Sequence, residues 1–133
     1  MFHLGSKSID NLLTCHMSIR VVINAAIKHS LIDFSVICGY RNEATQTEVF
    51  NNGKSKARWL ESPHNYDKSL AVDLYPYPVD WENVEPFHYL AGLVTGIGHA
   101  HGIPITWGGS WKTFKDLPHF ELTNWKELRD EHA

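Results

Sequence analysis

The sequence predicts an α+β domain in which a small, mostly antiparallel sheet is flanked by helices. Segments with helical spacing of apolar residues alternate with short apolar stretches of strand length, in the order helix, strand, helix, strand, helix, strand, strand. Hydrophobic residues make up 43% of the 133-residue chain and charged residues 20%, which is the balance of a globular protein. The chain has no internal repeat, linker or low-complexity tract. We therefore expect a single domain that spans residues 1–133.

The first half of the chain is predicted to place one strand between helices. Residues 8–30 carry apolar side chains at helical spacing, and His16 interrupts the apolar stripe, so either two helices or one bent helix is expected there. Residues 34–38 are typical of a short buried strand that ends at Gly39. The stretch NEATQTEVFNNG then predicts a helix closed by its final Asn-Gly pair.

The second half of the chain is predicted to supply the rest of the sheet. Residues 54–69 are polar and irregular, and the segment LAVDLYP after them is typical of a strand. Residues 84–100 show helical spacing, Gly102 is a natural terminator, and His99 and His101 are expected to cap that helix end. PITWGG and HFEL predict two more short strands, and NWKELRDEHA predicts a terminal helix.

Composition excludes several classes of function. The net charge of −3 offers no electrostatic footprint for nucleic acid, and no apolar segment is long enough for membrane insertion. The two cysteines, Cys15 and Cys38, are too few for a disulfide framework, and we expect both to be buried thiols of a reducing compartment. The N-terminus lacks the pattern of a secretory signal peptide, so we expect synthesis in the cytoplasm without export through that route.

An aspartate inside an apolar strand is the most informative feature of the sequence. Asp73 needs a compensating partner, because a buried carboxylate is costly, and Ala71 leaves room beside it on the same face of the strand. His64 lies in the preceding loop, and His119 begins a later strand with Asp116 three residues before it. Two histidines and an aspartate could bind zinc and leave a position open for water. By spacing alone, His64 and Asp73 could equally form a hydrogen-bonded pair, with His119 a satisfied core histidine.

Five further residues are candidates for substrate or transition-state contacts. Arg41 could stabilise an oxyanion or pair with a surface carboxylate. Gln46 could contact substrate or remain solvated on its helix, and Ser62 could orient a substrate group or hydrogen-bond within its loop. Trp107 could line a binding groove, and so could Trp111 on the other side of the Gly-Gly turn, although packing in the core explains both equally well.

Three separated motifs, in order, resemble one family. SPHNYDKSLAVDLYP resembles the Ser-x-His…Ala-x-Asp signature of the zinc peptidases that include the D-alanyl-D-alanine carboxypeptidases and dipeptidases and the phage L-alanyl-D-glutamate endolysins. GYRNEATQ resembles the family's Gly-Tyr-Arg segment with its downstream glutamine. AVDLYPYPVDW and IPITWGGSWKTFKDLPHFEL resemble the phage branch especially closely, and the similarity extends over residues 33–122. The resemblance implies the zinc peptidase fold shared by Hedgehog proteins and D,D-peptidases.

The resemblance also implies a role for individual residues. His64, Asp73 and His119 match the zinc ligands, Asp116 matches the catalytic carboxylate of the phage enzymes, and Arg41 matches the arginine at the oxyanion. Two departures stand out. His64 and Asp73 are nine positions apart where the commonest form has seven, and a serine follows WGG where an acidic residue is frequent.

The function that the resemblance implies is that of a phage endolysin. Such an enzyme would use Zn²⁺ to hydrolyse the L-alanyl-D-glutamate bond of murein peptide stems. We expect it to act as a monomer on the cell wall in the periplasm, after release from the host cytoplasm through a membrane lesion. The alternatives are a D,D-carboxypeptidase or dipeptidase of the same family, and a zinc-stabilised binding domain without catalysis.

Overall fold

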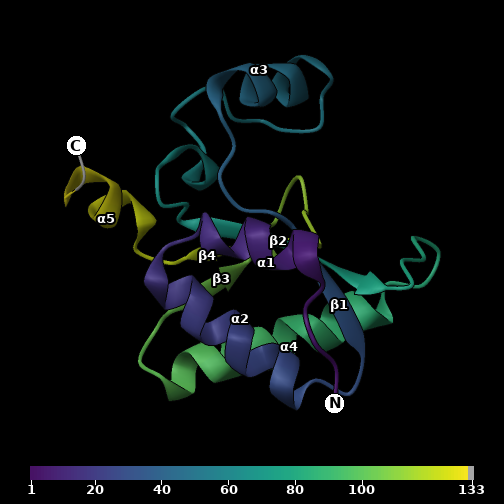
Figure 1. Cartoon of the computed structure of the whole chain (residues 1–133). Helices are drawn as coiled ribbons and strands as arrows, with labels where there is room; N and C mark the ends of the chain where they lie inside the picture. The colour runs from purple at the N-terminus through teal and green to yellow at the C-terminus, as the bar shows by residue number, and fades with distance from the viewer. Residues whose placement is uncertain (132–133) are drawn as a thin grey trace.

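The structure, a computed structural model, describes residues 1–131 and contains the predicted elements in the predicted order (Figure 1). The helices are α1 (Ser6–Leu13), α2 (Met17–His29), α3 (Glu43–Asn51), α4 (Glu85–Ala100) and α5 (Trp125–Glu131). The strands are β1 (Asp33–Cys38), β2 (Ala71–Tyr77), β3 (Ile105–Trp107) and β4 (His119–Leu122), and two 3₁₀ turns, η1 (Pro63–Asn65) and η2 (Gly108–Ser110), complete the fold. The last two residues of the predicted terminal helix lie outside the described residues.

The four strands form one sheet in the order β1-β2-β4-β3, and every neighbouring pair is antiparallel. The α+β prediction is confirmed. In the central pair Asp73 lies opposite His119 and Ala71 lies opposite Glu121. Because alternate residues of a strand share a face, these four side chains stand on the same face of the sheet.

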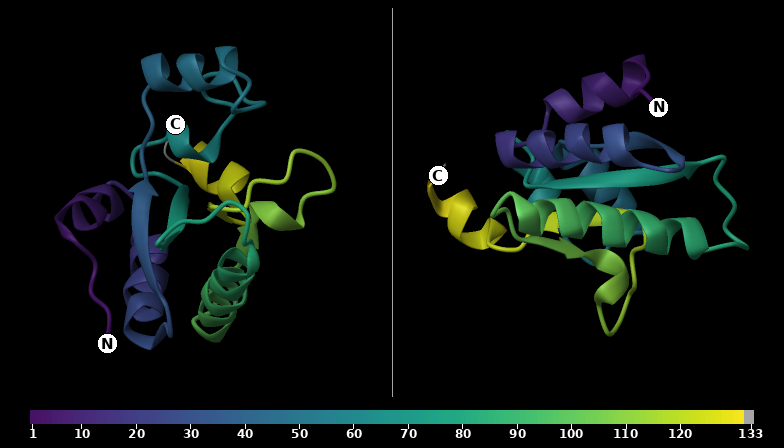
Figure 2. Two further views of the ribbon diagram at one scale, coloured as in Figure 1. Left: turned by 90° about the vertical axis from the view of Figure 1, so that its right-hand side faces the viewer. Right: turned by 90° about the horizontal axis from the view of Figure 1, so that it is seen from below.

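The other face of the sheet builds the hydrophobic core. Helices α2 and α4 lie side by side beneath it, whereas α3 stands apart from the sheet on the opposite side (Figures 1 and 2). The core joins these two helices to alternate residues of the strands, among them Val72, Leu74, Phe120 and Leu122. No helix in residues 1–131 combines the length and the apolar character needed to cross a bilayer.

The first helical region consists of two helices, which decides between the two alternatives that the sequence left open. Helix α1 ends at Leu13, and His16 becomes the N-cap of α2 because its Nδ1 accepts a hydrogen bond from the Ser18 amide at 3.1 Å. An N-cap residue takes a non-helical conformation, so the chain turns a corner at this histidine.

Helix α1 covers the outer edge of the sheet. The Ser8 hydroxyl accepts a hydrogen bond from the Val36 amide at 2.9 Å, and the Asn11 side-chain amide donates to the Val36 carbonyl at 2.9 Å. Val36 lies in the middle of β1, an edge strand, where unpaired backbone groups would otherwise face outward. Two polar side chains of α1 thus replace a neighbouring strand.

Candidate active site

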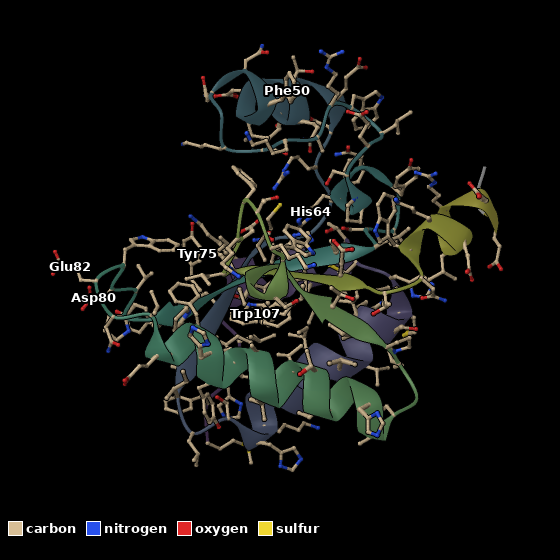
Figure 3. The ribbon with its side chains drawn as sticks, turned by 180° about the vertical axis from the view of Figure 1, so that it is seen from behind. Phe50, His64, Tyr75, Asp80, Glu82 and Trp107 are labelled. Atoms are coloured by element: carbon tan, nitrogen blue, oxygen red, sulfur yellow. The ribbon has the colours of Figure 1, made fainter. Side chains whose placement is uncertain are left out.

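An open cleft with a volume of about 710 Å³ lies over the polar face of the sheet. One wall comes from the segment between α3 and η1, the opposite wall from the loop between η2 and β4, and the floor from β2 and β4. Figure 3 shows two of the lining residues, His64 and Tyr75, on this face of the molecule. All five residues expected to bind metal or catalyse, namely Arg41, His64, Asp73, Asp116 and His119, line this cleft.

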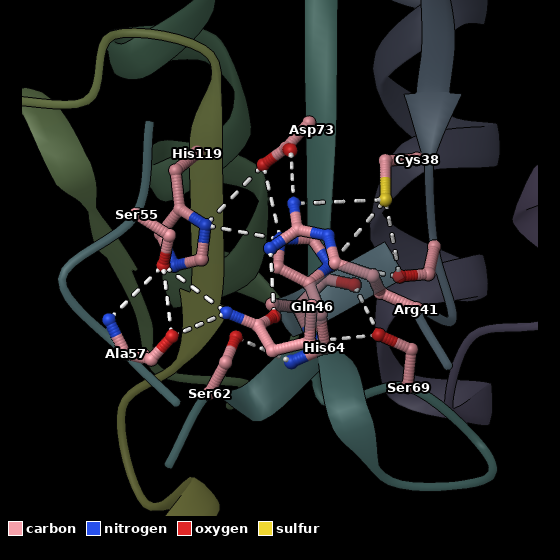
Figure 4. A network of polar contacts seen from close by, with 12 residues as sticks. Cys38, Arg41, Gln46, Ser55, Ala57, Ser62, His64, Ser69, Asp73 and His119 are labelled. Carbon is pink, nitrogen blue, oxygen red and sulfur yellow. Dashed lines mark hydrogen bonds and ion pairs between the residues drawn. The ribbon is translucent and has the colours of Figure 1, made fainter. Parts of the chain in front are cut away.

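Three of these side chains converge on one point at the floor of the cleft (Figure 4). The His64 Nε2 lies 3.2 Å from the Asp73 Oδ1, and the His119 Nδ1 lies 3.3 Å from the same oxygen. The two ring nitrogens are 3.2 Å apart. The three atoms therefore form a nearly equilateral triangle, although the residues come from η1, β2 and β4.

The contacts of the two ring nitrogens outside the triangle determine which nitrogen of each histidine carries the hydrogen. The His64 Nδ1 lies 2.7 Å from the Gly39 carbonyl oxygen, and the His119 Nε2 lies 2.7 Å from the Glu121 Oε1. A carbonyl oxygen or a carboxylate can only accept a hydrogen bond, so these two nitrogens carry the hydrogens. In the neutral rings the lone pairs then belong to the two nitrogens of the triangle, which is how metal-binding histidines are oriented.

The triangle fits a tetrahedral zinc ion. Zinc binds histidine nitrogen and carboxylate oxygen at about 2.0–2.2 Å, so two ligands of a tetrahedral site are separated by roughly 3.3–3.5 Å. The observed edges of 3.2, 3.2 and 3.3 Å come close to that value. With three protein ligands on the floor of an open cleft, a fourth position would face the substrate.

Electrostatics at the triangle also point to a cation. Burial alone would raise the pKa of the Asp73 carboxyl, but His64 and His119 lower that pKa well below its usual range. Burial lowers the pKa of His64, and the Asp73 charge outweighs this effect and raises it to about 10. Without a metal, a proton on His64 therefore adds to the Arg41 guanidinium as positive charge beside the buried Asp73.

Cys38 offers a second combination of donors. Cys38, His64 and Asp73 each present a ligand atom, and these atoms lie within 4.8 Å of one another. The thiol sulfur, however, lies 3.9 Å from the His64 Nδ1, the nitrogen already used by Gly39. The triangle that includes His119 is tighter than the set that includes Cys38. The expectation that Cys38 is fully buried was wrong, because this residue ends β1 at the rim of the cleft and is only half-buried, whereas Cys15 is buried.

The two extra residues between His64 and Asp73 are accommodated in a loop outside the cleft. The extra residues follow η1 and run against the corner between α1 and α2, where the Ser69 amide donates to the Thr14 carbonyl at 2.8 Å. The Ser69 carbonyl in turn accepts from the His16 amide at 2.8 Å. The chain is thereby returned to the start of β2, and His64 and Asp73 still meet.

Gly108 explains why the WGG segment is needed beside the site. A Cβ at Gly108 would collide with the Asp116 backbone and lie 3.0 Å from the His119 Cβ. The Gly108 carbonyl also accepts a hydrogen bond from the Asp116 amide at 3.1 Å. The glycine therefore lets η2 approach the turn that carries Asp116, which positions this carboxylate at the cleft.

The Asp116 carboxyl stands close enough to the triangle to respond to its charges. Burial raises its pKa, and the charge of Asp73 raises it further, while His119, His64 and Arg41 oppose the change. No hydrogen bond to its side chain occurs within residues 1–131, so the carboxylate is available to a water or a substrate. A carboxylate with this placement can act as a general base.

Arg41 is held over Asp73 by a buried glutamine. The guanidinium NH2 nitrogen lies 3.5 Å from the Asp73 Oδ2, and the NH1 nitrogen donates to the Gln46 Oε1 at 3.0 Å. Gln46 is 0% exposed, and its Oε1 also accepts from the Asn65 side chain at 3.0 Å. Its Nε2 donates to the Ser55 hydroxyl and the Ala57 carbonyl. Every polar atom of Gln46 is therefore engaged within the protein, so it positions Arg41 rather than facing the substrate.

Two other candidates for substrate contact also have structural partners. The Ser62 hydroxyl accepts from the His64 amide at 3.2 Å and forms a capping box with Asn65, which fixes η1 and its histidine. The Trp107 indole donates to the Leu117 carbonyl at 2.7 Å and is not among the lining residues. Trp111 lines the cleft instead, with its ring 5.1 Å from that of His119.

Glu121 is the functional residue that sequence reasoning missed. It lies two positions after His119 on the same face of β4, and the short hydrogen bond to the imidazole holds this ring in place. The signal was present in the segment HFEL, where a histidine and a glutamate alternate with two apolar residues of a strand.

Fold and site together define a small α+β domain that carries a cluster of possible metal-binding groups on the open face of an antiparallel sheet. The chain belongs to the phage L-alanyl-D-glutamate peptidase family, whose sequence model matches residues 1–124. It is 30% identical over 113 residues to the peptidoglycan L-alanyl-D-glutamate endopeptidase CwlK of Bacillus subtilis (strain 168), a match that spans 75% of this chain and 66% of that protein. It is 27% identical over 120 residues to the L-alanyl-D-glutamate peptidase of Escherichia phage T5, covering 86% of this chain and 85% of that protein.

Solved structures agree with this family. The L-Ala D-Glu endopeptidase ChiX of Serratia marcescens superimposes with a TM-score of 0.80 and 36% sequence identity, over 98% of this chain and 95% of that one. The LdcB LD-carboxypeptidase shares the fold, with a TM-score of 0.56 and 17% identity over 90% of this chain and 65% of that one.

Proposed function

We propose that this chain is a zinc-dependent endopeptidase that hydrolyses the L-alanyl-D-glutamate bond of peptidoglycan stems. The observation that carries the proposal is the convergence of His64, Asp73 and His119 in a triangle of zinc-ligand dimensions, in a chain of this family. A bound zinc ion would lower the pKa of a coordinated water to about 7 and polarise the scissile carbonyl. The protein residues around the ion would transfer the protons and stabilise the oxyanion.

Asp116 has the properties of the general base. Its carboxylate would accept a proton from the attacking water and later deliver it to the nitrogen of the leaving D-glutamate. Burial and the neighbouring Asp73 raise its pKa, which favours both steps because a base works best near the pH of the reaction. Its place on the cleft wall beside the ligands supports this role.

Arg41 would stabilise the negative charge that develops on the carbonyl oxygen. Its guanidinium is anchored by Gln46 on one side and faces Asp73 on the other, so little reorganisation is needed when the oxyanion forms. Glu121 would act through His119 by keeping the imidazole in the tautomer and orientation that binding requires.

The setting of the reaction is part of the same proposal. We propose that the single domain acts as a monomer on the cell wall, and that it reaches the periplasm from the host cytoplasm through a phage-made membrane lesion. The peptide stems of peptidoglycan would be its only macromolecular partner.

Digestion of purified murein tests the proposal. The wild-type protein should release fragments with a new amino terminus on D-glutamate, identified by mass spectrometry, and the activity should disappear with a chelator and return with zinc. An Asp116→Asn preparation that keeps its zinc is the matched inactive control. Zinc binding without any cleavage would support a non-catalytic scaffold, and a new terminus at another bond would reject the assigned specificity.

A further inference from the structure

The cleft contains a cation that the proposed mechanism does not use. Lys56 lies in the wall between α3 and η1 and lines the cleft beside Ser55 and Ala57. Its backbone is not a loose loop, because the buried Gln46 donates to the Ser55 hydroxyl at 3.2 Å and to the Ala57 carbonyl at 2.7 Å. The Ala57 amide also donates to the Ser55 hydroxyl at 3.1 Å. The glutamine that positions Arg41 therefore also fixes the base of the Lys56 side chain.

The ammonium group of Lys56 reaches the opposite wall. Its Nζ lies 5.3 Å from the centre of the Phe114 ring, within the range of a cation–π contact. Phe114 also lines the cleft and precedes Asp116 by two residues. The positive charge is thereby brought to the side of the cleft that carries the general base. No ion pair to Lys56 occurs within residues 1–131.

This inference rests on the proposed function, in which the L-alanyl-D-glutamate bond is cleaved. The chemistry of that bond places a carboxylate of the substrate on the Asp116 side of the cleft. Cleavage of L-alanyl-D-glutamate makes the D-glutamate nitrogen the leaving group, and that nitrogen must approach Asp116 to receive its proton. The stem continues through the side-chain carboxyl of D-glutamate, so its α-carboxyl remains as a branch. The carbon of that carboxyl lies only about 2.5 Å from the leaving nitrogen, by ordinary bond lengths and angles.

We propose that Lys56 binds the α-carboxylate of the D-glutamate residue and makes the enzyme select stems in which that group is free over stems in which it is amidated. Arg41 already serves the oxyanion in the proposed function, with its guanidinium fixed between Gln46 and Asp73. Lys126, another cation of the cleft, rests against Trp125 of α5, with its Nζ 5.6 Å from the ring centre. Among the lysines that line the cleft within residues 1–131, Lys56 is directed towards the Asp116 loop by its contact with Phe114.

Two synthetic stem peptides that differ only at this group provide the test. One carries D-glutamate with a free α-carboxylate, and the other carries the α-carboxamide. The wild-type enzyme should cleave the first with a kcat/KM roughly fivefold higher, the size expected of an exposed ion pair. The preference should shrink as salt is added, because exposed charges are screened.

Variants of Lys56 test whether this lysine causes the preference for the carboxylate peptide. Lys56→Met should lower kcat/KM on the carboxylate peptide roughly fivefold and leave the amide peptide within twofold of wild type, whereas Lys56→Arg should keep the preference. Lys54→Met tests the neighbouring cation, and Lys28→Met on α2 removes the same charge far from the cleft; both should retain the preference.

The possible failures are distinguishable. Equal cleavage of the two peptides by the wild type, or an unchanged preference in Lys56→Met, would overturn the inference and leave the proposed function standing. Loss of the preference in Lys54→Met alone would also overturn it. Cleavage of neither peptide by a zinc-loaded enzyme would reject the proposed function, and the subsite with it.

Discussion

The two faces of the central strand pair differ in what each side chain depends on. One face contributes apolar groups to the core, and the other carries side chains that hold one another in one geometry. The core set is Val72, Leu74, Phe120 and Leu122, and the cleft set is Ala71, Asp73, His119 and Glu121. The alternation of a strand thus separates stability from function within seven residues of β2 and four of β4.

The comparison shows why Asp73 is tolerated in an otherwise apolar strand. A charge on the core face would be left without a partner among aliphatic side chains, whereas Asp73 has two histidines and an arginine around it. Ala71 leaves space on the same face, opposite the Glu121 that supports His119. Asp73, His119 and Glu121 therefore depend on one another, and removing one of them should affect the others.

The largest difference in effect is expected between His119 and Phe120, which are adjacent in β4 but lie on opposite faces of the sheet. His119→Ala should abolish stoichiometric zinc binding and reduce murein cleavage to background, because it removes one of three ligands. Phe120→Ala should destabilise the fold by about 3–5 kcal/mol through a core cavity while folded molecules still bind zinc. Elemental analysis and urea unfolding distinguish the two. Zinc retained in full by His119→Ala would contradict the ligand assignment.

The next largest effect is expected at Asp116. Asp116→Asn keeps the size of the side chain but cannot accept a proton, so kcat should fall by roughly 10²- to 10⁴-fold while zinc content and thermal stability are kept. Single-turnover cleavage of a stem peptide measures the loss. A variant that lyses murein as fast as wild type would show that this carboxylate is structural.

Arg41 separates binding of the metal from stabilisation of the transition state. Arg41→Ala should lower kcat by roughly 10²- to 10³-fold, as for the loss of an oxyanion donor, without changing zinc affinity. Competition with a chromogenic chelator measures affinity alongside the kinetics. Near-normal turnover would mean that another group serves the oxyanion.

The pH dependence of the metal-free protein tests the electrostatics of the cleft face. The pKa of His64 is raised to about 10 in the folded chain, so its protonation stabilises the fold fully below the unfolded value of about 6.5 and this contribution is lost as the pH rises towards 10. The slope should approach about 1.4 kcal/mol per pH unit between those limits. Urea unfolding of chelator-treated protein at pH 6 and pH 9 measures it.

The zinc-loaded protein is the control for that experiment, because a bound cation replaces the proton and His64 stays neutral. At the acidic end the sign reverses. The lowered pKa of Asp73 contributes stability above the ordinary carboxyl value of about 3.8 that is lost as the pH falls below it. A metal-free stability that does not change between pH 6 and pH 9 would refute the paired proton.

Glu121 should give the smallest of these effects. Glu121→Ala removes the acceptor that orients His119 and should weaken zinc binding by about 10- to 100-fold, and Glu121→Gln should weaken it less because an acceptor remains. Glu127→Ala on the exposed side of α5 is the control for loss of charge. Unchanged affinity in Glu121→Ala would mean that packing alone orients His119.

Much of this arrangement could be predicted from local patterns. The order and approximate bounds of the elements followed from periodicity, and the aspartate in a strand correctly pointed to a polar face. The contacts of Gln46, Ser62 and Trp107 could not be foreseen in the same way, because each depends on where distant segments meet. A glutamine on a weakly amphipathic helix gives no sign that it will be fully buried against η1 and residues 54–57. The conformation of the longer loop after His64 could not be predicted either, since this loop packs against the corner between α1 and α2.

The packing of α1 along β1 has a consequence for crowded solutions. An uncovered edge strand is a template on which a second chain can add, and this is a route to aggregation. With β1 shielded by Ser8 and Asn11, the remaining edge of the sheet is β3, which is three residues long. A strand this short offers few backbone groups to a neighbouring copy. Both edges of the sheet are therefore protected against the addition of a further strand. The protein should tolerate high local concentrations without associating edge to edge.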